Sequence, residues 1–402
     1  MKNIKTFNTE SEYQSYITGS TAVLPNLSYV KGSDEVHITQ IPKVTAKFNI
    51  TSTGSTRILS STTSVSAVIV DGVKQNSVTT AYTFTTTGEH EVKYVLTGNT
   101  IENNAFRGSS AMTSANISKG VTSIDYAAFH DCSGLTSITI PNSVTAIGST
   151  AFFNCSGLTS VIIPNSVTSI GSQTFRHCVN LSSIIISDSI TSISSSAFED
   201  CPSLSSFTIP SGVTSIADYI FDGCSSLTSV TIPNGVTSIG CCAFLGCSGL
   251  TSVTIPNGVT SIDWGAFMNC QKLTSITIPS NLTQIKTQTF QGCKGLTSVV
   301  IPNNVTSIGS SAFSACTNLS RVTIGSSVSS IGESAFYNCT KLEYIDAYPS
   351  TPPTIQANTF RAVKSNGTLG CYDTSATAYT TNWMQSGAYY LGYYHWGLDV
   401  WL

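Results

Sequence analysis

Charged residues are scarce in this chain of 402 residues, where Asp, Glu, Lys and Arg together make up 10%. The formal net charge is −3, so the chain lacks the basic field that attracts nucleic acid or an acidic membrane surface. It has no run of 18 apolar residues, and we therefore expect no membrane insertion. Hydrophobic residues still account for 41% and recur periodically, which indicates a folded protein.

A secretory leader is also missing. Residues 1–19 carry two lysines, but neither an apolar segment nor a small-residue cleavage site follows them. We expect either a chain whose signal peptide has been removed or a protein that reaches its destination without one.

A 23-residue repeat dominates the chain. Phenylalanine occurs every 23 residues from Phe106 to Phe336, and cysteine follows three residues later from Cys132 to Cys339. The repeated unit is L-x-x-[IV]-x-I-P-x-x-V-x-x-I-x-x-x-A-F-x-x-C, with a degenerate first copy. Because one unit cannot bury its apolar face alone, consecutive units must stack and share one core. The sequence therefore predicts a leucine-rich solenoid over residues 99–345.

Each unit contains a strand and a returning side. Leu, Val and Ile alternate with Ser and Thr, which is typical of a strand with one buried face. Proline ends that strand because it lacks an N–H donor. Phe and Cys are three residues apart, which predicts one short helical turn with both side chains in the core. The expected fold is mainly β, with one long parallel sheet and short helical turns.

This pattern resembles the BspA-like leucine-rich repeats of bacterial surface proteins. L-x-x-[IV]-x-I-P corresponds to the sheet strand of that family, and V-x-x-I-x-x-x-A-F-x-x-C to its returning side. The departures are local, since Ser187 and Gly325 replace the proline and Phe207 replaces an aliphatic residue. The resemblance implies adhesion to host proteins, matrix or other cells.

The region before the repeats is predicted to be β-rich. Residues 1–45 are expected to form a helix and strands that attach the chain. Residues 46–98 are expected to form a small immunoglobulin-like β-sandwich that covers the open edge of the solenoid. Within it, Val65, Ala67 and Ile69 should share one face.

Residues 346–402 are predicted to form a C-terminal cap. Phe360 lies 24 residues after Phe336, so the repeat register ends there, and a short helix is expected near residues 375–385. The aromatic tail has two interpretations. Its rings cover the last rung, or they form a platform for an oligomer or a ligand.

Residues 7–38 resemble, more loosely, N-terminal segments of structural proteins from bacteriophages of gut Bacteroidales. This resemblance implies a virion-associated protein, which needs no signal peptide because virions assemble inside the host cell. Residues 1–98 would then make the virion or self-assembly contacts.

The sequence contains no motif for catalysis or cofactor binding. The regularly spaced cysteines lack the C-x-x-C pairs of a metal site, and we expect reduced, buried thiols that act as small hydrophobes. No nucleophile elbow, Walker loop or dinucleotide fingerprint occurs. Carboxylates near Arg176 are expected to form an exposed charged patch. We therefore predict no catalytic residue, no cofactor, no metal and no enzyme activity.

The outward positions of the strand offer a different surface, rich in Thr and Ser, as at Thr251 and Ser252. Such a lattice has two interpretations. It binds ice or glycans, or it consists of strand-forming residues that keep an exposed sheet soluble without charge.

The returning side varies from one repeat to the next. The residue after each repeated Phe changes chemistry at every rung, and aromatic side chains beside variable polar ones are typical of a binding edge. Leu245, Trp264 and Met268 should form a small exposed apolar patch there. The alternative is an unconstrained surface. The candidate partner-binding edge consists of Tyr126, His130, Phe153, Arg176, Tyr219, Leu245, Trp264, Met268 and Tyr337.

These observations predict a non-enzymatic binding or adhesion protein. It would present its solenoid to a protein or glycan on a host cell or mucosal surface, either from a virion or at the extracellular cell surface. One alternative is a bacterial cell-surface adhesin without its signal peptide. Another is a purely structural virion decoration or spacer protein. No nucleic acid partner is expected.

Overall fold

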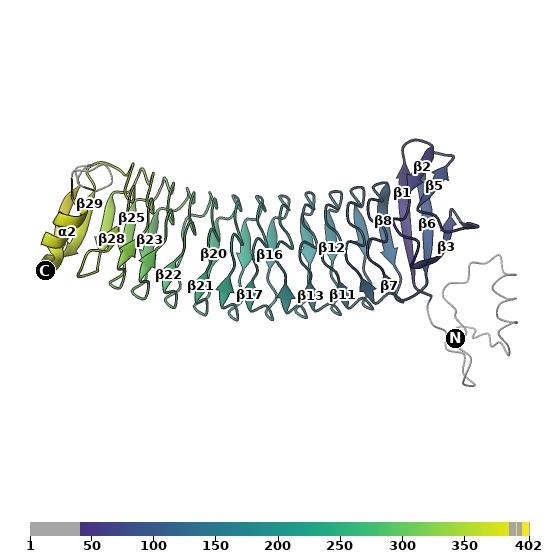
Figure 1. The fold of residues 1–402 in the computed structure, drawn as a ribbon, viewed down its shortest axis with the longest axis horizontal. Helices are drawn as coiled ribbons and strands as arrows, with labels where there is room; N and C mark the ends of the chain where they lie inside the picture. The colour runs from purple at the N-terminus through teal and green to yellow at the C-terminus, as the bar shows by residue number, and fades with distance from the viewer. Residues whose placement is uncertain (1–40, 386–390, 392–395, 402) are drawn as a thin grey trace, which may run out of the picture.

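The computed structural model describes residues 41–385, 391 and 396–401. They form a long, slightly curved solenoid with a β-sheet region at its N-terminal end and helix α2 (Ala376–Trp383) at the other (Figure 1). Of the attachment segment predicted at residues 1–45, residues 1–40 lie outside the described part of the chain. Residues 7–38, which carry the resemblance to phage proteins, lie entirely outside it as well. The predicted mainly β solenoid is confirmed.

Stacked phenylalanines form the centre of the solenoid. The rings from Phe106 to Phe360, here called the phenylalanine column, lie nearly parallel, with centroids of successive rungs 5.0–5.7 Å apart. Phe221, Cys224 and Leu227, taken as one rung, are fully buried. The inward-facing residues predicted from the 23-residue spacing therefore form a continuous dry core.

Two parallel strand ladders flank the column, each pairing residues one rung apart, such as Ser229 with Ser252 and Ile239 with Ile262. The first ladder consists of β8 (Met112–Ile117), β10 (Ser137–Thr139), β12 (Ser160–Ile162), β14 (Ser183–Ile185), β16 (Ser206–Thr208), β18 (Ser229–Thr231), β20 (Ser252–Thr254), β23 (Ser298–Ile301), β25 (Arg321–Ile324), β27 (Tyr344–Ala347), β29 (Thr368–Tyr372) and β30 (Gly397–Trp401). The second consists of β7 (Thr100–Ile101), β9 (Ser123–Ile124), β11 (Ala146–Ile147), β13 (Ser169–Ile170), β15 (Ser192–Ile193), β17 (Ser215–Ile216), β19 (Ser238–Ile239), β21 (Ser261–Ile262), β22 (Gln284–Ile285), β24 (Ser307–Ile308), β26 (Ser330–Ile331) and β28 (Thr354–Ile355).

Both ladders are divided into shorter sheets, which differs from the single long sheet expected. One division separates β14 from β16. There Phe207 packs between the column rings Phe198 and Phe221, with centroid distances of 4.9 and 4.8 Å. The extra ring accompanies this division, but the ladder is also divided between β10 and β12, which carry no phenylalanine.

The segment around each column ring is a tight turn rather than a regular helix. In the rung of Phe129, the amide of Cys132 donates to the Phe129 carbonyl at 3.2 Å, while the Phe129 amide donates to Ala151 of the next rung at 2.8 Å. Ala127 and Asp131, two residues before and after the ring, have φ values of 54° and 60°. Left-handed residues on both sides interrupt a right-handed helix, and they free backbone groups for bonds between rungs.

The N-terminal region adds an antiparallel sheet to the first rung. Its strands pair in the order β1 (Lys43–Ile50), β6 (Gly88–Leu96), β3 (Val65–Val70) and β4 (Val73–Lys74). A separate two-stranded sheet consists of β2 (Gly54–Arg57) and β5 (Ala81–Phe84). β1 pairs with β6 on one side and with β8 of the solenoid on the other, so the open edge of the first ladder is covered. The immunoglobulin-like assignment of residues 46–98 stays a prediction.

Of the three residues predicted to share one face of β3, Ala67 and Ile69 do so, but Val65 lies on the buried face instead. Val68 and Val70 are buried, whereas Ala67 and Ile69 are only half-buried. The pairing of β3 with β6 shifts between Val65 and Ala67, and such a bulge moves the following side chains to the opposite face.

Helix α2 lies where the short helix was expected and closes the C-terminal end of the core. Trp383 is fully buried and packs on Phe360, the last ring of the column, at 5.2 Å. Its indole N–H donates to the Pro353 carbonyl at 2.9 Å. At the opposite end Tyr94 packs on Phe106 at 4.9 Å. Aromatic side chains therefore cover both ends of the column.

Candidate functional site

The residues that follow the column rings line up along the surface of the solenoid. This variable row consists of His130, Phe153, Arg176, Glu199, Asp222, Leu245, Met268, Gln291, Ser314 and Tyr337. Its first members contact one another in sequence. His130 stacks on Phe153 with centroids 4.6 Å apart, the Arg176 guanidinium lies 5.9 Å from the Phe153 ring, and Arg176 Nη2 lies 2.7 Å from Glu199 Oε1. The structure thus places His130, Phe153 and Arg176 of the predicted edge in contact with one another along the row.

Carboxylates follow this aromatic and cationic part of the row. Burial raises the pKa of Asp222 to about 6, and the nearby Glu199 and Asp200 carboxylates add to the increase. Asp200 also lies 3.3 Å from Nδ1 of His177. The acidic cluster expected near Arg176 is therefore present. It is less exposed than expected at Glu199, whose side chain is only 13% exposed because it pairs with the guanidinium.

The other residues of the predicted edge differ in exposure. Tyr126, Trp264 and Tyr337 are exposed by 52%, 38% and 38% of their surface. Leu245 and Met268 are only half-buried, so Trp264 is the exposed member of the predicted apolar patch. Tyr219 is also half-buried, where its hydroxyl lies 3.6 Å from the Cys241 thiol. Whether these residues act as one edge stays a prediction.

The repeated thiols are structural. Each thiol from Cys132 to Cys339 donates to the carbonyl of a column residue 26 positions earlier, at sulfur–oxygen distances of 3.0–3.3 Å. All cysteines are free, and burial raises the pKa of thiols such as Cys201 and Cys316 to about 12. Within the described parts of the chain, no cluster of His, Cys, Asp and Glu could hold a metal ion.

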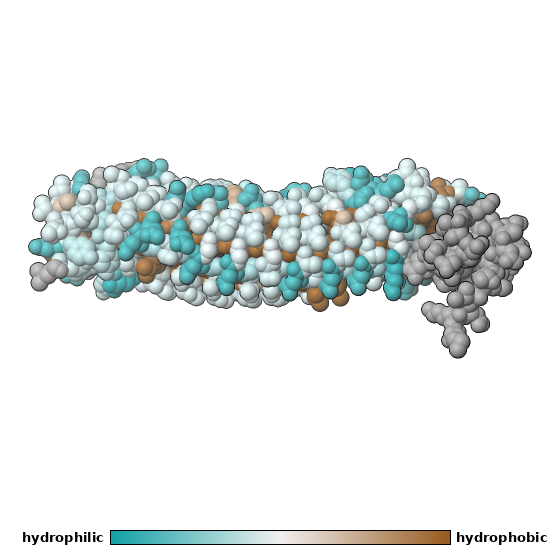
Figure 2. Space-filling view, turned by 90° about the horizontal axis from the view of Figure 1, so that it is seen from below, coloured by the Kyte–Doolittle hydropathy of each residue, from teal (hydrophilic) through white to brown (hydrophobic). Residues whose placement is uncertain are grey.

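Threonine hydroxyls of the surface lattice bond to the backbone. Thr251 donates to the Thr228 carbonyl at 3.3 Å, and Thr274 donates to Thr251 in the same way. The donor of each such hydroxyl is therefore used within the solenoid. Figure 2 shows one face of the solenoid that is mostly pale, with hydrophobic residues in a broken line along the axis and in a few patches beside it. This arrangement favours the interpretation that Thr and Ser stabilise and solubilise the sheet.

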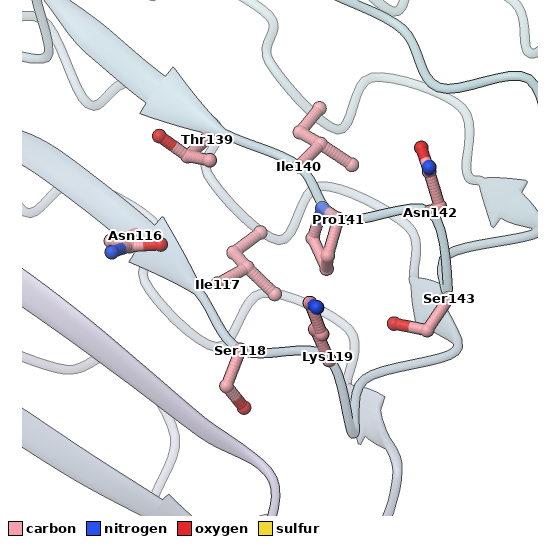
Figure 3. A pocket seen from close by; sticks show the side chains of 9 residues that line it. All are labelled: Asn116, Ile117, Ser118, Lys119, Thr139, Ile140, Pro141, Asn142 and Ser143. Carbon is pink, nitrogen blue, oxygen red and sulfur yellow. The ribbon is translucent and has the colours of Figure 1, made fainter.

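A hollow of about 860 Å³ lies where the first two rungs turn away from β8 and β10 (Figure 3). Ile117, Ile140 and Pro141 supply apolar walls, with Asn142 and Lys119 among the polar side chains. No carboxylate, imidazole or thiol lines it. The hollow can hold a small group, but its walls offer no acid and base pair for catalysis.

Three rings lie on the outward face of the last rungs, and one of them, Trp401, belongs to the aromatic tail that the sequence offered as a possible ligand platform. Tyr348, Tyr372 and Trp401, here called the aromatic platform, have centroids 5.1–5.9 Å apart. Tyr348 occupies the position that holds proline in most rungs. The replacement of proline by tyrosine was the feature of the sequence that could have drawn attention to this surface. Tyr372 and Trp401 follow at other spacings, so only strand pairing brings them together.

Comparison with protein families identifies the repeat. The family described as BspA type leucine rich repeat region matches six copies, over residues 99–228, 214–343 and 288–369. The chain belongs to the BspA-type leucine-rich repeat family. Repeats of this type are typical of cell-surface proteins. No curated protein matches the chain.

Several solved structures are similar. A leucine-rich cell surface protein from Faecalibacterium prausnitzii is 36% identical over 62% of this chain and 76% of its own, with a TM-score of 0.45. A leucine-rich repeat protein from Bacteroides ovatus is 24% identical over 80% of this chain and 90% of its own, with a TM-score of 0.53. The pneumococcal vaccine antigen PcpA is 18% identical over 76% and 85%, with a TM-score of 0.50.

The described segments include no helix with the length and hydropathy needed to cross a bilayer.

Proposed function

We propose that this chain is a non-enzymatic recognition protein of the adhesion type, which presents its solenoid to a protein or glycan on a cell or mucosal surface. The observation that carries the proposal is the variable row. Identical rungs hold side chains of different chemistry at equivalent positions, from His130 and Arg176 to Tyr337. A rigid backbone with a changing outer row suits recognition of an extended partner.

Membership of the BspA-type family supports a location at the cell surface, as does the cell-surface description of the Faecalibacterium protein. Display on a virion is a second prediction. It rests on residues 7–38, which the structure leaves out, and genes for capsid or tail proteins beside this one would support it. A spacer protein without a ligand is the remaining alternative, and a binding experiment separates it from both.

The test measures binding of the fluorescently labelled chain to epithelial cells and to mucin-coated surfaces. We expect saturable binding that weakens at least fivefold when Tyr126, Trp264 and Tyr337 are all replaced by Ser. A matched variant with Thr139, Thr208 and Thr231 replaced by Ser changes three exposed positions of the other face and should bind normally. No saturable binding to either surface would favour the spacer, and equal loss in both variants would contradict the edge.

A further inference from the structure

The outward face of the last rungs differs chemically from the same face elsewhere. β25, β27, β29 and β30 pair in register, so their outward residues form rows across one continuous sheet. In a middle rung these positions hold Ser252, Thr254 and Pro256. In the last rungs the row that holds proline elsewhere becomes the aromatic platform. The backbone geometry is shared, so the change lies in the side chains.

Covering the core does not require the platform. Trp383 and Tyr379 do so from helix α2, where both are fully buried and both donate to backbone carbonyls. Tyr348 and Tyr372 instead keep 38% and 39% of their surface exposed. Clustered aromatic rings that remain in solvent indicate an interaction site rather than a structural one.

A glycine positions the central ring. A β-carbon at Gly370 would lie 2.3 Å from Cζ2 of Trp401, so the indole lies directly against the glycine backbone. The Tyr348 ring lies 5.1 Å from the indole at an interplanar angle of 37°, and the Tyr372 ring lies 5.8 Å away at 88°. The glycine lets a broad ring face lie close to the sheet, with a tyrosine on two sides.

Polar groups surround the rings. Arg321 donates to Asp346 at 2.8 Å and lies 5.5 Å from the Tyr344 ring, which is itself 42% exposed. Asp399 is exposed and pairs in register with Gly370, beside the indole. The formal charges of Arg321, Asp346 and Asp399 sum to −1.

We infer that the aromatic platform binds a neutral sugar unit of an oligosaccharide. A pyranose ring has a face of C–H groups that can stack on the indole, and a rim of hydroxyls that can bond to Asp399 and the tyrosine hydroxyls. The exposed aliphatic side chain on this face of the sheet, Val300, lies on β23, two strands beyond β27, and the exposed Val400 belongs to the opposite face of β30. The immediate surroundings of the rings therefore offer polar groups rather than the aliphatic side chains that a protein partner would use. The excess of carboxylate disfavours acidic sugars. This inference rests on the proposed recognition function and names its ligand class.

The experiment applies the full chain to a printed array of neutral and sialylated oligosaccharides, then titrates the best neutral binder by calorimetry. We expect binding to neutral oligosaccharides and a loss of tenfold or more in the Tyr348→Ala, Tyr372→Ala double variant. Val73→Ala, which shortens an exposed apolar side chain of β4 at the opposite end, should bind like the wild type. Matching thermal unfolding curves show that the variants fold.

Three outcomes overturn the inference: no array binding, equal binding by the double variant, or displacement of the sugar by tetramethylammonium at equal concentration, which would indicate a cation site. Adhesion to mucin and cells is measured in parallel. Adhesion of the wild type without any array binding removes the platform and leaves the recognition function intact. Loss of both in the wild type removes both.

Discussion

The phenylalanine column and the variable row are one residue apart in every rung, yet they follow opposite rules. Column positions hold the same residue from Phe106 to Phe360, whereas the row changes from Phe153 to Arg176 to Glu199 in successive rungs. Column rings are buried on all sides by the rungs above and below, so a change of volume affects two neighbours. Row side chains other than Ser314 keep one side in solvent. The difference shows that burial, rather than position in the repeat, constrains the sequence.

Shortening a column residue should reduce stability more than any other change considered below. Phe221→Ala removes a ring that stacks on Phe198 and Phe244, and the free energy of unfolding should fall by about 3–5 kcal/mol. Phe153→Ala in the row is the matched control and should cost about 1 kcal/mol, because that ring is half-buried. Urea denaturation followed by circular dichroism measures both. Similar losses in the two variants would contradict the distinction.

Buried and partly exposed thiols should differ in reactivity. Burial raises the pKa of Cys201 to about 12, which lowers its thiolate fraction about a thousandfold from that of an ordinary thiol. Cys241 is the partly exposed member of the 13 cysteines, all of which lie in described parts of the chain. We expect one thiol per molecule to react with Ellman's reagent in the native state and none in Cys241→Ser. Rapid reaction of several native thiols would show that the rungs open.

A carboxylate in the row should reduce stability as pH rises. The pKa of Asp222 is raised to about 6, so the folded state holds this proton more tightly than the unfolded state, and stability falls as pH increases from about 4 through 6. Asp222→Asn should therefore be more stable than the wild type by about 1 kcal/mol at pH 7.5, after allowance for solvent screening. The two should be equally stable below pH 4. A gain of the same size at both pH values would exclude ionisation as its cause.

The smallest expected effect concerns the threonine lattice. Thr251→Val removes a hydroxyl that donates to the Thr228 carbonyl, but that carbonyl still accepts the Thr251 amide at 3.2 Å. A loss of about 0.5 kcal/mol is expected in urea denaturation. Thr254→Val, at an exposed position of β20 three residues later, should cost less. The reverse order would mean that the backbone bonds of the hydroxyls do not stabilise the solenoid.

Much of the core could be predicted from spacing alone. Residues 23 apart must occupy equivalent sites in a stack, so Phe221, Cys224 and Leu227 were correctly expected to be buried. The turn around each ring was less predictable. Its left-handed positions hold residues as different as Ala127, Tyr219 and Asn338, and these types do not identify a positive φ. The β3 register failed for a similar reason, because nothing in the sequence VSAVIV marks the position of the bulge.

The candidate sites show the same division. Spacing placed the variable row on one side of every rung, but it could not show that Arg176 lies over Phe153 and pairs with Glu199, since those contacts depend on rotamers and on distances between rungs. Of the aromatic platform, only Trp401 belongs to the tail that the sequence offered as a possible ligand platform, and Tyr348 and Tyr372 were not expected there. Trp401 and Gly370 are 31 positions apart and meet only because β30 pairs with β29.

By itself, the sequence determined the repeat length, the identity of the buried side chains and the family, because burial demands the same volumes at every rung. Tertiary structure alone decided which exposed side chains meet, where the ladders divide and how the ends of the column are covered. Those outcomes depend on backbone φ angles and on pairing between distant strands, and a periodic pattern carries information about neither.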